Sequence, residues 1–384
     1  MSAPSDNLTP PATVTQGARQ LLLLGAGMAH LEVLKALAKS PLEGVQITLV
    51  SPHAQLWHAA TLPGFIAGHY RPEDCTFPLE PLVQRSGVHW MKANVVALNA
   101  DARTVDLDNG RTLHFDWLSV NTGPVHNRDL IELQIPGARE HALFLRPLDN
   151  FAVLWPQVCA MAATRPLRVA VVGGGASGIE TALAVQYRLP TAAVTLLTGS
   201  APADRAFETT VQQQLQEALK TRRVTVLQDS AISIQADSVT LGCGANLACD
   251  VTVLATGAQP PRWLAAGGLA LDSNGFVAVE SAQRSTSHST VFAAGDISSR
   301  SDVSRPRNGV FARRSGIPLA RNLVRAVQGQ EPQAAVPGQR HLQIVSLGNR
   351  QAIMTWGGLH AQGRWVWWLK HWIDRRYLAS ITGP

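Results

Sequence analysis

The sequence contains the same strand–glycine–helix pattern twice. The first copy is QLLLLGAGMAHLEVLKALAKS at residues 20–40, and the second is LRVAVVGGGASGIETALAVQYRL at residues 167–189. In each copy an apolar run, typical of a strand buried on both faces, leads into a glycine turn and then into a helical pattern. Because such units build parallel sheets covered by helices, we expect an α/β fold with two Rossmann-like domains.

The glycines of the two turns indicate sites for a dinucleotide. A turn without side chains lets a pyrophosphate approach the helix N-terminus, where unpaired N–H groups attract anions. The first turn has Gly25 and Gly27, with His30 in place of the third glycine of the usual fingerprint. The second turn has the complete set, Gly173, Gly175 and Gly178. For the first copy taken alone, the alternative is a glycine-rich turn that binds nothing.

Both copies continue alike. A second strand follows each helix, VQITLVS from residue 45 and AVTLLTG from residue 193. Each half then ends in a strand that runs into a Thr-Gly turn, formed by Thr122 and Gly123 in the first half and by Thr256 and Gly257 in the second. Two complete dinucleotide folds in one chain indicate one nucleotide that is held tightly and one that exchanges.

A third segment, TSHSTVFAAGD at residues 286–296, predicts a strand that ends in Gly295 and Asp296 at a helix entrance. With it, the chain resembles the flavoprotein disulfide reductase superfamily, whose members have two dinucleotide-binding domains. The resemblance implies that Asp296 binds the ribityl chain of FAD, that Gly25 and Gly27 lie on the FAD pyrophosphate, and that the second turn binds NADH or NADPH. The alternative for Asp296 is a helix N-cap.

The resemblance implies a discontinuous FAD-binding domain with the NAD(P)H-binding domain inserted into it. We place the FAD-binding domain at residues 18–150 and 275–330, and the NAD(P)H-binding domain at residues 151–274. Residues 1–17 are polar and rich in Pro, Ser and Thr, which favours a disordered leader over a signal peptide. Residues 335–384 form a C-terminal region.

The cysteines argue against a dithiol mechanism. The chain has four of them, Cys75, Cys159, Cys243 and Cys249. No two have CxxC spacing. Sulfide:quinone oxidoreductases often have one reactive cysteine near the position of Cys159, but their second, C-terminal cysteine has no counterpart in this sequence. We therefore expect electrons to pass from the nicotinamide to the flavin and then directly to an acceptor.

The chain from about residue 20 onward resembles type II NADH:quinone dehydrogenases and, more closely, the flavoprotein module often fused to selenophosphate synthetase. The segments that carry the pattern are LPGFIAGHYRPEDC at residues 62–75, NGVFARRSGIPLARNL at residues 308–323 and GRWVWWLKHWIDRRY at residues 363–377. The resemblance implies an FAD-dependent NAD(P)H dehydrogenase that reduces a quinone-like acceptor. The alternative is a redox partner in selenium metabolism that acts with selenophosphate synthetase. Two features depart from the pattern: Val310 and Arg314 stand where the dehydrogenases have quinone-site glutamines, and the sequence contains no synthetase domain.

Three further residues are candidates for the chemistry. Gly309 lies at the start of a helix near residue 308, whose N-terminus would point at the flavin, and Arg314 would engage the acceptor. Glu180, on the first turn of the second helix, would relay a proton or orient the nicotinamide. The plainer alternatives are a solvated arginine and a glutamate that stabilises the start of a helix.

The ends of the second strands leave the choice of nicotinamide cofactor open. An acidic residue normally follows this strand and binds the ribose 2′-OH, but the chain has Ser51 in the first half and Thr198 in the second. Thr198, Ser200 and Arg205 would accommodate a 2′-phosphate. We therefore expect either NADH or NADPH.

The C-terminal segment combines tryptophan with basic residues. It follows a predicted hairpin with its turn at Gly348 and Asn349. On a helical wheel one arc contains Trp365, Trp368, Leu369, Trp372, Ile373 and Tyr377. The opposite arc contains Lys370, Asp374 and Arg375, and the residues that break the pattern are Trp367 and Arg376. This mix favours a helix at a membrane surface, where a lipid-soluble acceptor would reach the flavin. The alternative is packing on the flavin domain or on the partner of a homodimer.

Composition narrows the partners and the location. The net charge is +6 and the pI is near 9.5, which favours a phosphate-bearing cofactor or an anionic membrane surface. No run of five basic residues occurs, so we expect no nucleic acid partner. We also expect no membrane-spanning helix and, because His30, His58 and His69 lack the spacing of a metal site, no metal. The expected location is the cytoplasm, with peripheral contact to the inner face of the membrane.

Overall fold

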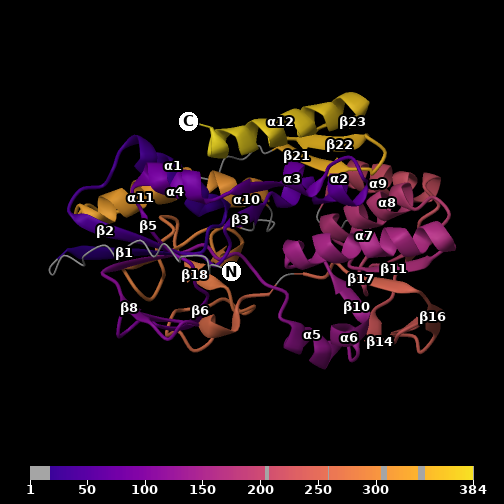
Figure 1. Cartoon of the computed structure of the whole chain (residues 1–384), viewed down its shortest axis with the longest axis horizontal. Coiled ribbons are helices and arrows are strands. Elements are labelled where there is room, and N and C mark those ends of the chain that lie inside the picture. Colours follow the sequence, from indigo (N-terminus) through magenta and orange to yellow (C-terminus); the bar gives the residue numbers. More distant parts are fainter. Residues whose placement is uncertain (1–17, 204–206, 258, 304–308, 336–341, 384) are drawn as a thin grey trace, which may run out of the picture.

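The computed structural model describes residues 18–203, 207–257, 259–303, 309–335 and 342–383 of the chain. Figure 1 shows two α/β domains side by side, with the C-terminal region lying across the upper side of both. The predicted leader and Arg205 lie outside the described residues.

The first domain is built on a parallel sheet of five strands in the order β19-β9-β1-β2-β5. The strands are β1 (Arg19–Leu24), β2 (Val45–Val50), β5 (His89–Met91), β9 (Trp117–Val120) and β19 (Val291–Ala293). Leu21 and Leu23 of β1 pack in the core with helix α1 (Met28–Lys39), whereas Leu22 and Leu24 pack in the core on the other face. This two-sided burial explains the uninterrupted run of leucines. Since β19 comes from the chain after the second domain, the first domain is discontinuous, as predicted.

Helices and small sheets cover both faces of this sheet. The helices of the first domain are α1, α4 (Glu80–Ser86), α10 (Gly309–Arg314) and α11 (Gly316–Val327), with the shorter α2 (Leu62–Ile66), α3 (Pro72–Cys75), η1 (Ala59–Thr61), η2 (Arg262–Leu264) and η3 (Gly295–Ile297). An antiparallel sheet is formed by β6 (Val95–Asn99), β7 (Thr104–Leu107) and β8 (Thr112–His114). Two strand pairs complete the domain, β3 (Gln55–Trp57) with β4 (Thr76–Pro78) and β18 (Val277–Val279) with β20 (Ser298–Arg300).

The second domain repeats this plan with a parallel sheet in the order β10-β17-β11-β12-β13. Its strands are β10 (Ala142–Phe144), β11 (Arg168–Val172), β12 (Ala193–Leu197), β13 (Thr225–Leu227) and β17 (Val251–Leu254). Its helices are α5 (Arg128–Gln134), α6 (Ala138–His141), α7 (Leu148–Thr164), α8 (Ala176–Arg188) and α9 (Thr209–Thr221), and its antiparallel sheet is β14 (Ala231–Ile234), β15 (Ser238–Leu241) and β16 (Asn246–Ala248). Strand β10 precedes residue 151, where we placed the start of this domain; the domain bounds remain predictions.

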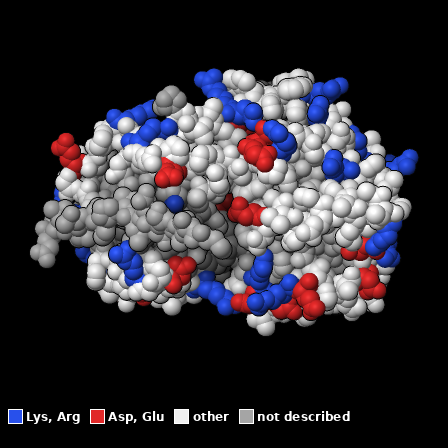
Figure 2. Space-filling view, in the orientation of Figure 1, with Lys and Arg blue, Asp and Glu red and all other residues white. Residues whose placement is uncertain are grey.

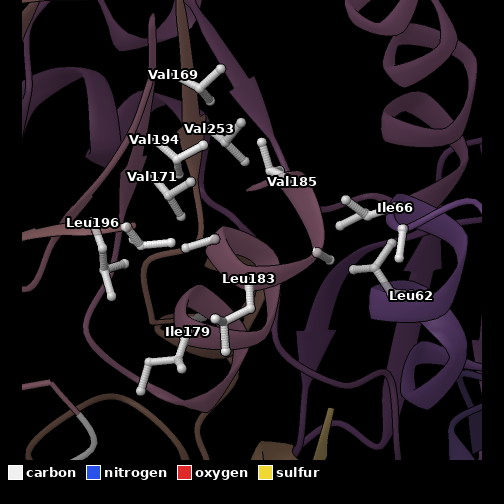
Figure 3. Close-up of a cluster of buried hydrophobic side chains, with 14 of the residues drawn as sticks. Leu62, Ile66, Val169, Val171, Ile179, Leu183, Val185, Val194, Leu196 and Val253 are labelled. Atoms are coloured by element: carbon white, nitrogen blue, oxygen red, sulfur yellow. The ribbon is translucent and has the colours of Figure 1, made fainter. Parts of the chain in front are cut away.

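One hydrophobic core joins the two domains. Figure 3 shows valines and leucines of β11, β12 and β17 facing Ile179 and Leu183 of α8, with Leu62 and Ile66 of α2 beside them. Because α2 belongs to the first domain and α8 to the second, this core fixes the position of the second glycine turn relative to the first domain. We call the two glycine turns the first and second pyrophosphate turns.

The C-terminal region is an antiparallel sheet followed by a long helix. Its elements are β21 (Leu342–Ser346), β22 (Ala352–Trp356), β23 (Leu359–Gly363) and α12 (Arg364–Thr382). The predicted hairpin is confirmed, and Gly348 in its turn has φ of +79°, a conformation that favours glycine. In the described parts of the chain, no helix combines the length and the apolar character that crossing a bilayer requires.

The outer face of α12 agrees with the predicted arc at its tryptophans. Trp365, Trp368 and Trp372 are exposed to 56%, 54% and 55%. These three side chains therefore do not pack on the flavin domain, which removes that alternative for them. A contact with a membrane or with a second protein remains for this face.

The inner face of α12 differs from the prediction. Tyr377, which the wheel placed on the tryptophan arc, is buried, and so is Asp374 on the opposite arc. Trp367, which did not fit the wheel, is buried beside Val366. The wheel was wrong at Tyr377, and it gave no sign that Asp374 is buried, where His58 and Lys370 offset the cost of its burial.

Candidate functional site

The first pyrophosphate turn lies between β1 and α1, and Gly27 is the N-cap residue of α1. Gly25 has φ of +86°, and a Cβ atom there would lie 2.7 Å from the carbonyl oxygen of Asn121. A Cβ atom at Gly27 would collide with both the backbone oxygen and the side-chain oxygen of Asn121. The chain itself therefore requires both glycines, because the end of β9 passes directly behind the turn.

His30 occupies the space behind the same turn. Its ring is fully buried, with Nδ1 at 2.6 Å from the carbonyl oxygen of Gly25 and Nε2 at 2.8 Å from the hydroxyl of Ser119. Since a carbonyl can only accept, we assign the ring proton to Nδ1, with Nε2 accepting from Ser119. Burial lowers the pKa of His30 to about 4, so the ring is neutral at neutral pH. His30 thus replaces the third glycine with a pair of hydrogen bonds.

The other candidates for FAD follow strands of the same sheet. Ser51 follows β2, Thr122 and Gly123 follow β9, and Gly295 and Asp296 follow β19. Since these strands are parallel to β1, all five residues lie at the sheet edge that carries the pyrophosphate turn. A Cβ atom at Gly123 would meet no protein atom within 4 Å, so this edge has room for a bound group.

The charge of Asp296 acts on Arg146, a partly buried residue that sequence analysis did not single out. Burial lowers the pKa of the Arg146 guanidinium, and the negative charge of Asp296 acts against that shift. Arg146 follows β10 of the second domain, so this electrostatic interaction acts between the two domains. Gly309, the first residue of α10, lies next to α1: a Cβ atom there would be 3.1 Å from Sδ of Met28. A glycine turn at a helix N-terminus and an acid for hydroxyl groups, at one sheet edge, fit FAD.

The second pyrophosphate turn, between β11 and α8, is built differently. A Cβ atom at Gly173 would lie 2.5 Å from the carbonyl oxygen of Ala255, and one at Gly178 would collide with the carbonyl oxygen of Gly173. Gly175, the N-cap of α8, has an ordinary φ of −82°, and a Cβ atom there would meet nothing within 4 Å. The protein does not require glycine at this position, so the free space suits a pyrophosphate at the helix N-terminus.

The edge of the second sheet also fits a nucleotide. Thr256 follows β17, and its hydroxyl is buried without a hydrogen-bond partner among the described residues, which a bound nucleotide can satisfy. A Cβ atom at the adjacent Gly257 would meet no atom within 4 Å. Thr198 follows β12 and donates its hydroxyl proton to the carbonyl oxygen of Ala201, at 2.8 Å. Its hydroxyl is therefore engaged within the chain, and the choice between NADH and NADPH remains a prediction.

Glu180 connects α8 with the C-terminal region. Its Oε1 accepts a hydrogen bond of 2.7 Å from the backbone N–H of Ser346, at the end of β21. Burial raises the pKa of Glu180 to about 7, while the positive charge of Lys370 and the hydrogen bond from Ser346 act in the opposite direction. A carboxyl group with this pKa binds and releases a proton near neutral pH.

Lys370 belongs to a buried charged cluster that sequence analysis missed. Its ammonium group donates to Oδ2 of Asp374 at 2.7 Å and to the carbonyl oxygen of Ala60 at 2.5 Å, and Nε2 of His58 lies 2.9 Å from Oδ1 of Asp374. Burial alone would raise the pKa of Asp374, but Lys370 and His58 outweigh it and lower the pKa to about 2. The spacing of Lys370 and Asp374 was visible on the helix, whereas His58 is 316 positions away.

Arg314 is exposed in the last turn of α10. The neighbouring Arg313 makes the contacts to other helices: its Nε is 3.3 Å from Oε1 of Glu32, and its guanidinium carbon is 4.4 Å from the ring centroid of Tyr377. Arg313 therefore ties α10 to α1 and α12, and the role of Arg314 toward an acceptor remains a prediction.

The four cysteines are free thiols in the structure. Cys75 and Cys249 are buried, and burial raises the pKa of both thiols, that of Cys75 to about 11. Cys243 is exposed and Cys159 is partly exposed. The two buried thiols lack the lowered pKa that a redox thiol needs at neutral pH.

Comparison with known proteins places the chain in a family. The pyridine nucleotide-disulphide oxidoreductase family matches residues 19–324. The chain belongs to this family. The type II NADH:quinone oxidoreductase of Staphylococcus aureus is 27% identical to it over 187 residues, which cover 46% of this chain and 45% of the relative. The chain thus matches less than half the length of the first curated relatives.

Two solved structures share the fold over nearly the whole chain. The sulfide:quinone oxidoreductase of Aquifex aeolicus superposes with a TM-score of 0.80 at 16% identity, covering 95% of this chain and 92% of that one. NDH2 from Plasmodium falciparum, solved in complex with NADH, has a TM-score of 0.76 at 13% identity, covering 96% of this chain and 99% of that one. The predicted two-domain fold is confirmed, and the family confirms FAD and NAD(P)H as the cofactors.

Proposed function

We propose that the protein is an NAD(P)H dehydrogenase that passes electrons through FAD to a quinone-like acceptor without a redox-active disulfide. The observation that carries the proposal is Glu180, whose pKa of about 7 places a titrating carboxyl group between α8 and the C-terminal region. Reducing a quinone consumes protons as well as electrons, so a site for it needs a group that donates a proton at neutral pH.

The residues around the two turns have separate roles in binding the cofactors. When bound, FAD would supply the redox chemistry that links NAD(P)H to the acceptor. Gly25 and Gly27 hold the FAD pyrophosphate, Asp296 binds its ribityl hydroxyls, and the open space at Gly175 admits NAD(P)H. Lys370 stabilises the carboxylate of Glu180 after it has given up its proton, because the positive charge of Lys370 lowers the pKa of Glu180.

The exposed face of α12 supports contact with a membrane surface. Trp356 and Leu359, at the turn between β22 and β23 of the same C-terminal region, are also exposed, to 48% and 65%. Figure 2 shows Lys and Arg side chains at the upper edge of the molecule, over α12. Tryptophan settles at the depth of lipid headgroups, and basic residues attract anionic lipid. A quinone dissolved in the bilayer would then reach the enzyme without crossing water, with the enzyme bound to the inner face of the membrane.

Quinone is favoured over the selenium alternative by the relatives. A type II NADH:quinone oxidoreductase is among them, and none of the relatives named above acts in selenium metabolism. Arg314, in place of a quinone-site glutamine, engages the acceptor in this proposal.

Anaerobic titration of the purified flavoprotein tests the acceptor. We expect NADH or NADPH to bleach the flavin, and a quinone added next to restore its colour. Short-chain and long-chain quinones should be compared with ferricyanide as a soluble acceptor. A flavin that NAD(P)H reduces but no quinone reoxidises would rule out a quinone acceptor and leave the two nucleotide sites standing.

Changing Trp365, Trp368 and Trp372 to Ser tests the membrane contact. Burying such a side chain is worth about 1.5–3 kcal/mol, so binding to anionic vesicles should fall more than tenfold, and turnover with long-chain quinones with it. Ferricyanide reduction should persist. The matched control changes three exposed apolar residues outside α12, Leu133, Val153 and Leu154, to Ser, and should bind vesicles normally. A wild type that ignores vesicles at low salt would contradict the membrane role.

A further inference from the structure

Helix α1 has no capping side chain of its own. Its N-cap is Gly27, and the first N–H groups of any helix lack partners within the helix. A Ser or Asp at this position would satisfy them, but its Cβ atom would collide with the backbone and side-chain oxygens of Asn121 behind the turn. The chain supplies the cap from another strand. Oδ1 of Asn121, which follows β9, accepts hydrogen bonds from the N–H groups of Ala29 and His30, both at 3.0 Å.

The other end of the same side chain holds a second segment of the site. Nδ2 of Asn121 donates to the carbonyl oxygen of Ala294 at 2.5 Å, directly before Gly295 and Asp296. A Cβ atom at Gly295 would lie 2.6 Å from this Nδ2. Asn121 is only 2% exposed. One buried amide thus lies between the pyrophosphate turn and the loop that carries Asp296.

We propose that Asn121 is a positioning residue for FAD, which caps α1 from the sheet side and sets the spacing between the pyrophosphate turn and Asp296. FAD must contact both segments at once, so its affinity depends on their being held at that spacing before it binds. This role does not depend on which acceptor takes the electrons.

The chemistry of the side chain explains why asparagine stands at this position. The position needs an acceptor for two N–H groups and a donor for one carbonyl, and a primary amide provides both. Aspartate would keep the acceptor but would turn a second oxygen toward the carbonyl of Ala294. Alanine would leave three buried backbone groups without this partner.

Asn121→Ala and Asn322→Ala form a matched pair that tests this role. Asn322 is also 2% exposed and also makes three hydrogen bonds, with the backbone of Ala282 and Gln333. FAD should be removed from each purified protein, and the unfolding of the apoprotein and the Kd for added FAD measured. Both changes should lower the melting temperature. Only Asn121→Ala should weaken FAD binding, by about tenfold or more.

Asn121→Asp separates the cap on α1 from the hydrogen bond to Ala294. It also covers the case in which the alanine variant does not fold. This variant should keep α1 capped, but its side chain can no longer donate a hydrogen bond to the carbonyl oxygen of Ala294, before Asp296. It should therefore release FAD faster than the wild type and shift the visible absorption of the bound flavin. Unchanged FAD affinity and an unchanged flavin spectrum in a folded Asn121 variant, or an equal loss of FAD affinity in Asn322→Ala, would overturn the proposal.

Discussion

The two pyrophosphate turns share one sequence pattern but are closed in different ways. Behind the first turn, the ring of His30 and the amide of Asn121 fill the space with hydrogen bonds. Behind the second, Gly178 lies directly against the carbonyl of Gly173, and no side chain intervenes. In front of the second turn, a Cβ atom at Gly175 would meet no protein atom.

The difference teaches that a glycine fingerprint serves two separate needs. Some of its glycines let parts of the chain approach one another, as at Gly27 and Gly178, and others leave room for the ligand, as at Gly175. A first turn fixed by buried side-chain hydrogen bonds suits a nucleotide that stays bound. A second turn fixed by backbone packing and open in front suits one that exchanges, in agreement with the predicted roles.

The largest expected effect concerns the second turn, where one glycine is predicted to leave room for the ligand and another allows close packing of the chain. Gly175→Val adds atoms only in the open space where we propose that NAD(P)H binds, so the KM for NAD(P)H should rise more than a hundredfold, with FAD content and melting temperature near the wild-type values. Gly178→Ala drives a Cβ atom into the carbonyl of Gly173 and should instead destabilise the domain. Steady-state kinetics and a thermal melt of both variants would show this difference between Gly175→Val and Gly178→Ala. A Gly175→Val protein with normal kinetics would break the comparison.

A smaller effect is expected for Glu180→Gln, on the helix that follows the second turn. General acids contribute on the order of a hundredfold or more, so quinone reduction should slow by about that factor while the flavin is still reduced by NAD(P)H. In the wild type the rate should fall as pH rises through about 7, where Glu180 loses its proton, and this step should be missing from the variant. Pre-steady-state rates between pH 5.5 and 8.5 measure both.

The pH dependence of the stability of Glu180→Gln provides an independent test of the titration of Glu180. The pKa of Glu180 is raised by folding from 4.5 to about 7, so the folded state binds the proton more tightly than the unfolded state. The wild type should therefore lose stability as pH rises through that window, and Glu180→Gln should lose less. Equal pH dependence of the two melting temperatures would show that Glu180 does not titrate in this range.

The smallest of these effects concerns the first site. Asp296→Ala removes a charged acceptor from the ribityl hydroxyls, worth about 1.5–3 kcal/mol, or roughly a tenfold to hundredfold rise in the Kd for FAD. NAD(P)H binding at the second turn should not change. Flavin occupancy after dialysis provides the measurement, and Asp108→Ala, at an exposed turn outside the site, is the control. Full flavin retention in Asp296→Ala would show that Asp296 does not bind FAD.

The sequence predicted the elements that short-range patterns define. The leucines of β1, the two turns and the strand that ends at Asp296 were readable because strand burial and phosphate approach depend on residues that are neighbours in the chain. The discontinuous first domain was implied by the resemblance to the flavoprotein disulfide reductase superfamily. The roles of Asp296 and Gly175 were inferred from resemblance and spacing, and they remain predictions until the variants are measured.

Periodicity alone could not predict which charges are buried. Charged side chains are rarely fully buried unless they are paired, and the wheel, which placed Asp374 opposite the tryptophans, could show no partner outside the helix. The structure buries it because Lys370 and His58 compensate the charge, and His58 comes from the other end of the chain. Likewise, Glu180 gains its raised pKa only when α8 and the C-terminal region enclose it.

The sequence by itself determined that this protein has two dinucleotide folds, since each is a local motif that forms wherever its strand, turn and helix occur together. Only the tertiary structure decided how each turn is closed and which groups stand beside it. Asn121 and His30 became parts of the first site because β9 lies against β1. Lys370 became part of the second because the C-terminal region packs on both domains, with α12 on β4 and α4 and with β21 on α8. Burial and electrostatic fields arise between segments far apart in sequence, so they take their values only when the chain has folded.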